Sequence, residues 1–174
     1  MEWTGFALFL AGSALAALAA WRLRPAIWSS ATAAALAAAL LFAAGEEISW
    51  GQRILDVETP DVLIDGNGQD ELNLHNLAGV QNKAVLGQLA VASGGVLLGR
   101  RGRRQWMQRG LPFFAGYLAY RVARGVFSLA EWGAAGRHSE AAEVLLSAGL
   151  LVIAAGLFED ASSSHRSGGS PASG

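Results

Sequence analysis

Five apolar stretches, separated by polar or charged segments, run along the 174-residue chain. A helix needs about 20 mostly apolar residues to cross the hydrocarbon core of a bilayer. We therefore predict an all-α, polytopic integral membrane helix bundle, with transmembrane helices over residues 3–21, 26–45, 83–99, 111–130 and 141–158. The third stretch is the shortest, and the fourth contains Arg121 and Arg124. The prediction is a single transmembrane domain over 1–160, with an outer loop over 46–82 and a flexible Ser/Gly-rich tail over 161–174.

Basic residues predict the orientation of this bundle, because cytoplasmic loops of membrane proteins carry an excess of lysine and arginine. With the N-terminus outside and the C-terminus inside, eight of the 13 basic residues fall inside, three fall outside and two lie in the fourth stretch. Glu2 precedes the first stretch, and Arg22 and Arg24 follow it, which is the reverse of a cleaved signal peptide. We therefore expect a retained first helix and a multi-pass protein of a bacterial inner (plasma) membrane.

The composition is typical of a membrane protein. Only 16% of the residues are charged, whereas soluble domains contain about 25%. Most of the six tryptophans, including Trp50, fall near predicted helix ends, as in the aromatic belts of bilayer proteins. The net charge of −1 argues against a nucleic-acid partner. The absence of cysteine excludes disulfides and a thiolate nucleophile. We expect membrane lipids as partners, with a homo-oligomer or a larger membrane complex as further possibilities.

Ionisable and polar residues recur at a similar depth, toward the outer ends of several predicted helices. The set comprises Glu46, Glu47, Ser49, His75, Asn76, Arg121, Arg124 and Glu143. An ionisable residue inside a bilayer is costly, so it normally faces the bundle interior and has a partner. Arg121 is the deepest charge in the predicted helices, and we expect Glu46, Glu47 or Glu143 to pair with it.

One interpretation of this set is a polar site open to the outside that hydrolyses or modifies a lipid-like substrate. The catalytic groups would be Glu46, Glu47 and His75, with the carboxylates acting as an acid/base pair. The substrate would be bound by Ser49, Asn76, Arg121 and Arg124, and one of the two arginines would bind its anionic group. In a metal-dependent version, a divalent metal ion is the cofactor, held by Glu47, His75 and Glu143, since hard oxygen ligands with one imidazole suit such an ion. Its bound water would attack an ester or amide.

Two other interpretations explain the same residues. The set is also typical of an ion-pair network that holds helices together in a non-catalytic accessory subunit of a larger membrane complex. Chains of glutamate, histidine and arginine also conduct protons or ions. Residue spacing does not choose among these three functions.

Three sequence blocks carry a resemblance to a known family: EEISWGQR at 46–53, ETP at 58–60 and NLHN at 73–76. In these blocks the chain resembles a family of small bacterial multi-pass membrane proteins that has no settled activity. The resemblance implies a membrane architecture and draws attention to those positions, and it implies no reaction. The membrane hydrolases that include alkaline ceramidases offer only an analogy of chemistry. Their pattern needs a late histidine pair, whereas His138 here falls in a loop and His165 in the tail.

Overall fold

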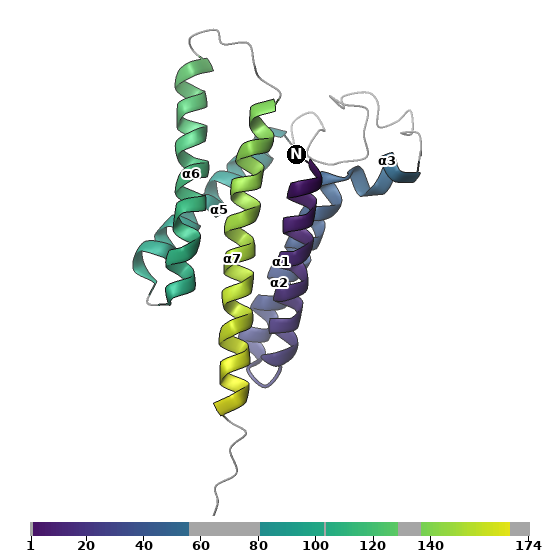
Figure 1. Ribbon diagram of the computed structural model, residues 1–174, viewed down its shortest axis with the longest axis vertical. Helices are drawn as coiled ribbons and strands as arrows, with labels where there is room; N and C mark the ends of the chain where they lie inside the picture. The colour runs from purple at the N-terminus through teal and green to yellow at the C-terminus, as the bar shows by residue number, and fades with distance from the viewer. Residues whose placement is uncertain (1, 56–80, 103, 129–136, 168–174) are drawn as a thin grey trace, which may run out of the picture.

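The computed structural model describes residues 2–55, 81–102, 104–128 and 137–167. These residues form α1 (Glu2–Arg22), α2 (Ile27–Glu47), η1 (Ser49–Gly51), α3 (Gln52–Leu55), α5 (Gln81–Arg101), α6 (Gln105–Ser128) and α7 (Arg137–Ser167). Figure 1 shows the long helices side by side, with short turns joining α1 to α2 and α5 to α6. The described part of the chain contains no strand, so the predicted all-α class is confirmed there.

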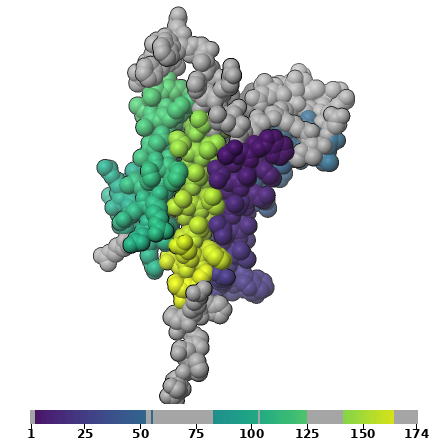
Figure 2. All heavy atoms as spheres, in the orientation of Figure 1, coloured from purple at the N-terminus to yellow at the C-terminus, as the bar shows by residue number. Residues whose placement is uncertain are grey.

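The long helices pack as a row in the order α2, α1, α7, α6, α5. The main packing partners of α7 are α1 on one side and α6 on the other, while α2 packs on α1 and α5 packs on α6. Figure 2 shows α7, in yellow, between the purple α1 and the green α6. The most C-terminal of the described helices therefore lies in the middle of the bundle.

Small residues let α1 and α2 approach closely. The Ser13 hydroxyl, 8% exposed, donates a 2.9 Å hydrogen bond across the interface to the carbonyl oxygen of Ala37. Ala16 and Ala44, which are at most 1% exposed, belong to the same packed cluster as Phe9. Helices in lipid associate through such close packing of small residues, because the hydrophobic effect does not drive them together there.

On the other side of the row, glycines leave space in which large aromatic rings of a neighbouring helix pack. Phe114 of α6, 1% exposed, lies between Gly95 of α5 and Gly149 of α7. A Cβ atom built on either glycine would come within 2.9 Å of the Phe114 ring. Trp106 covers Gly156 in the same way, and its indole nitrogen donates a 2.9 Å hydrogen bond to Asp160. Any larger side chain at these glycines would push the rings out of place.

Three of the described helices are both long and apolar enough to cross a membrane: α1, α2 and α7. Only 22% of the apolar 18-residue segment of α2 is buried inside the protein. Apolar residues of this helix such as Ile27 and Leu41 are exposed. Large apolar surface on an isolated chain indicates a membrane or protein partner. The less apolar α5 contains the third predicted span, and α6 covers residues 111–128 of the fourth. Three of the five predicted transmembrane helices are therefore supported by length and composition.

Several helices extend beyond their predicted ends. The helix α7 continues to Ser167, whereas the sequence pattern places a flexible tail from residue 161. The serines there fit a helix because their hydroxyls bond to preceding carbonyls: Ser162 to Phe158, and Ser163 to Asp160. The helix α6 begins at Gln105 rather than near residue 111, so Pro112 lies inside it.

Candidate functional site

The C-terminal end of α2 holds the candidate site, and a left-handed turn follows it directly. Glu46 and Glu47 form the end of the helix, and Ile48 caps it. Ser49, Trp50 and Gly51 then have φ angles of 48°, 54° and 82°. Only glycine adopts such angles freely, and other residues pay roughly 1–2 kcal/mol each. Ser49 therefore lies outside α2, in the turn that follows Glu47 and Ile48.

This turn folds Trp50 back onto the helix that precedes it. The indole nitrogen of Trp50 donates a 2.7 Å hydrogen bond to Oε1 of Glu46. The ring lies over Gly45, where a Cβ atom would come within 2.8 Å of it, and meets Phe42 edge-on with 5.5 Å between centroids. Glu46 is thus buried, at 8% exposure, and its carboxylate has a fixed donor. Trp50 itself is 52% exposed, so the belt tryptophan expected from the sequence also serves as a hydrogen-bond donor to Glu46.

Glu47 points toward the neighbouring helix. A Cβ atom on Gly5 of α1 would lie 2.8 Å from Oε2 of Glu47. The glycine therefore leaves room for a carboxylate between two apolar helices. Ser49, 1% exposed, is buried at the same end of α2. Glu46, Glu47 and Ser49, three of the predicted site residues, are brought to one place by the end of this helix.

Three local features of this segment are unfavourable for folding alone. Two carboxylates lie at the negative end of the α2 dipole, one of them is buried, and two non-glycine residues are left-handed. Strained backbone persists where surrounding structure holds it, and it clusters at functional sites. The accumulation of such features within 46–51 is therefore an argument for function at this end of α2.

Replacing Gly45 with alanine tests the packing of this turn. In a helix interior, glycine to alanine normally stabilises by about 0.5–1 kcal/mol. At Gly45 we expect the opposite sign, because the new methyl group would displace the Trp50 ring and break its bond to Glu46. The matched control is Gly94→Ala in α5, where no side chain or other helix among the described residues comes within 4 Å of the new methyl group. Thermal unfolding midpoints in detergent should fall for Gly45→Ala and rise for Gly94→Ala. A rise for both would contradict the packing described.

A second polar cluster joins α5 and α6. Arg121 donates from Nε to the Tyr117 hydroxyl, at 2.9 Å, and from Nη2 to Oε1 of Gln88, at 2.7 Å. The Tyr117 hydroxyl donates to the same oxygen of Gln88, at 2.9 Å. Three side chains thus form a closed triangle of hydrogen bonds.

The partners of Arg121 differ from those expected. The sequence predicts a glutamate, whereas the hydrogen bonds described for Arg121 go to Gln88 and Tyr117. Gln88 was detectable as the single amide inside the apolar stretch 83–99, since a polar residue there needs a partner. Its pairing with Arg121 depends on how α5 and α6 rotate against each other, which periodicity does not determine.

The predicted site residues thus fall into two groups and a remainder. Glu46, Glu47 and Ser49 lie at the end of α2, and Arg121, Arg124 and Glu143 lie on α6 and α7. Figure 1 shows the end of α2, the end of α6 and the start of α7 at the same end of the bundle. His75 and Asn76 lie outside the described residues. Within the described ranges, no three histidine or acidic side chains group closely enough to hold a metal ion, and the predicted metal set includes His75.

No known protein family, curated protein or solved structure matches this chain. The resemblance carried by residues 46–53, 58–60 and 73–76 therefore stays a prediction.

Proposed function

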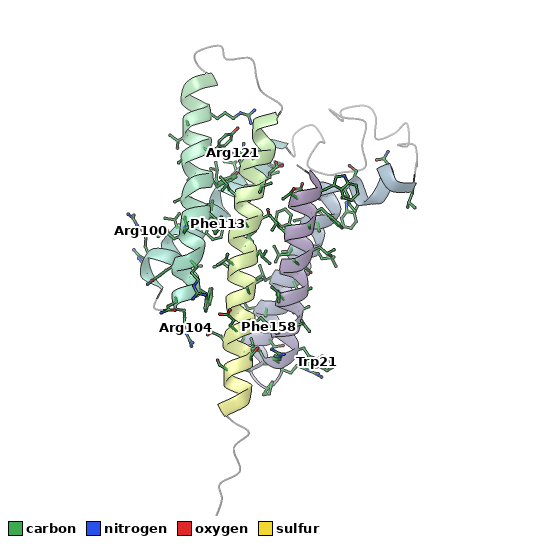
Figure 3. All side chains as sticks on the ribbon, viewed as in Figure 1. Trp21, Arg100, Arg104, Phe113, Arg121 and Phe158 are labelled. Atoms are coloured by element: carbon green, nitrogen blue, oxygen red, sulfur yellow. The ribbon has the colours of Figure 1, made fainter. Side chains whose placement is uncertain are left out.

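We propose that this chain is a multi-pass protein of a bacterial inner membrane, with five membrane helices, its N-terminus outside and its C-terminus in the cytoplasm. The distribution of charge supports this orientation. Figure 3 shows Arg104 in the lower part of the bundle and Arg121 in the upper part. Arg104 pairs with Asp160 at 3.0 Å, and Arg22 bonds to Ser162. Basic residues gather at this lower end, as they do on the cytoplasmic side of membrane proteins.

The proposed function is hydrolysis or modification of a lipid-like substrate at the outer end of α2, with Glu46 and Glu47 as the catalytic groups. The observation that carries it is the strained turn, which buries Glu46 and fixes its carboxylate through Trp50. A half-buried Glu47 beside it can take up a proton as a general base. Ser49 and Arg124 would orient the substrate.

A divalent metal ion is the proposed cofactor of the same site. Carboxylate oxygens of Glu47 and Glu143 together with the imidazole of His75 have the donor chemistry that such an ion accepts. Bound there, the ion would lower the pKa of a water molecule and supply a nucleophile near neutral pH.

Metal content tests this version of the proposal. Purified wild-type protein should contain about one divalent ion per chain, measured by inductively coupled plasma mass spectrometry. Glu47→Ala and His75→Ala should lose it while keeping the wild-type elution volume in gel filtration. Glu159→Ala, an exposed acid near the end of α7, is the matched control and should retain the ion. Metal-free wild-type protein would contradict the metal-dependent version.

The acid/base version has its own test. The protein, reconstituted with bacterial lipids, should release fatty acid or a headgroup that mass spectrometry detects, and Glu46→Gln should abolish the release. Absence of any product from the wild-type protein, with or without added metal, would contradict lipid chemistry.

A second candidate function is that of a non-catalytic subunit of a larger membrane complex. One observation favours it: α2 lies at the edge of the row, and only 22% of its apolar 18-residue segment is buried within this chain. Another membrane protein could cover that face. Native gels of gently solubilised membranes distinguish the two functions, since a subunit migrates at the mass of its complex, and a band at monomer or homodimer mass contradicts this second candidate.

A further inference from the structure

The Arg121 cluster has features of an anion-binding site that is separate from the carboxylates at the end of α2. Arg121 is half-buried, and Tyr117 beneath it is fully buried. Figure 3 shows Arg121 in the upper part of the bundle. A guanidinium at such a position normally has a carboxylate partner. Within the described residues, its hydrogen bonds go instead to two neutral oxygens.

The two bonds also determine which part of the guanidinium is left for a ligand. Arginine has five N–H donors in a rigid fork. Nε and one hydrogen of Nη2 are used by Tyr117 and Gln88. Of the three other donors, one on Nη1 and one on Nη2 share the end-on edge of the guanidinium. This edge matches the spacing of two oxygens of a phosphate or carboxylate, which arginine binds in bidentate fashion.

The neighbours hold the fork in place without neutralising it. Gln88 Oε1 accepts from both Tyr117 and Arg121, so the amide, the phenol and the guanidinium fix one another. The Tyr117 ring lies 5.3 Å below the guanidinium carbon and is packed among Ala92, Ala142 and Leu146. A donor edge held in advance loses less conformational freedom when a ligand binds.

We propose that Arg121 binds a phosphate oxyanion through its Nη1/Nη2 edge, with Gln88 and Tyr117 as positioning residues. In a chain with three candidate membrane helices, a phospholipid headgroup and free phosphate are the two sources of such an anion.

Binding to the full-length protein in dodecyl maltoside tests the proposal. Isothermal titration calorimetry with inorganic phosphate forms one arm. Dioctanoyl phosphatidylglycerol forms the other, with dioctanoylglycerol as the phosphate-free control. Arg121→Gln should weaken binding about tenfold or more, the effect of losing a charged hydrogen-bonded pair. Arg109→Gln, an exposed arginine near the start of the same helix, should change it less than twofold. Tyr117→Phe should weaken it less than Arg121→Gln does.

The arms and variants separate the outcomes. Binding in one arm alone identifies the source of the phosphate, and binding in neither arm overturns the proposal. Equal losses in Arg121→Gln and Arg109→Gln would indicate diffuse charge attraction, and wild-type affinity in Arg121→Gln would exclude the site. If Arg121→Gln fails to fold, Arg121→Lys keeps the charge without the fork, and undiminished affinity in that variant contradicts bidentate binding. The metal and lipid-product measurements on Glu46 and Glu47 variants are independent of these results, so the two proposals can fail separately.

Discussion

Replacing Phe114 with alanine is expected to lower the free energy of unfolding by about 3 kcal/mol, the low end for a buried phenylalanine. The ring is 1% exposed and fills the space between Gly95 and Gly149, so its removal leaves a cavity between three helices. The low end applies because the separated helices stay in lipid, and the loss is therefore mainly one of packing. The midpoint of unfolding in a detergent titration measures the effect.

The neighbouring residue supplies a matched control. Phe113 has the same side chain and is only half-buried, so Phe113→Ala should be distinctly milder. Gly149→Leu approaches the same packing from the other side, because even its Cβ atom would meet the Phe114 ring at 2.9 Å. If Phe114→Ala and Phe113→Ala lowered the midpoint equally, the close packing of α5, α6 and α7 would be refuted.

Placing an arginine at Ala38 is expected to disturb membrane insertion of α2. Ala38 is exposed near the middle of the helix. In water an exposed substitution of this kind usually changes stability by less than about 0.5 kcal/mol. At the centre of a bilayer, an arginine costs about 2.5–3.5 kcal/mol on insertion scales. A glycosylation-mapping assay in microsomes should therefore show a lower inserted fraction for Ala38→Arg.

The same substitution at the end of α2 controls for charge alone. Ile27 is 72% exposed and begins the helix, where a long arginine can reach the headgroup region. Ile27→Arg should thus insert about as well as the wild-type protein. Equal insertion of Ala38→Arg and the wild-type protein would mean that the exposed apolar face of α2 does not meet lipid.

Hydrophobic patterning was sufficient to locate the long helices. The runs at 3–21, 26–45 and 141–158 are apolar on almost every side, so they predict α1, α2 and α7 and their capacity to span a membrane. Helix ends were harder to predict. Ser162 and Ser163 suggest a flexible tail by composition, yet serine hydroxyls satisfy helix carbonyls at the end of α7. A polar composition is thus compatible with a helix wherever such local bonds form.

The candidate site was predictable only in part, for two physical reasons. Glu46 and Glu47 stand out because charge adjoins an apolar run. The left-handed turn does not, because Ser49 and Trp50 have side chains that disfavour it, and only the surrounding packing holds it. Likewise, Gln88 and Arg121 meet because two helices have a particular rotation. Tertiary packing of this kind overrides what the local sequence favours.

The central position of α7 has a consequence for biogenesis. The ribosome makes α1 and α2 first, then α5 and α6, and each pair can form a helical hairpin with a short connection. The contacts that join the hairpins run mainly through α7, so they form only once that helix has emerged. Contacts between segments this far apart in the chain form slowly. The Glu46 turn and the Arg121 cluster belong to different hairpins. In a nascent chain that stops before α7, the helix that packs against both hairpins is missing, so the two sites would not yet be held in one bundle.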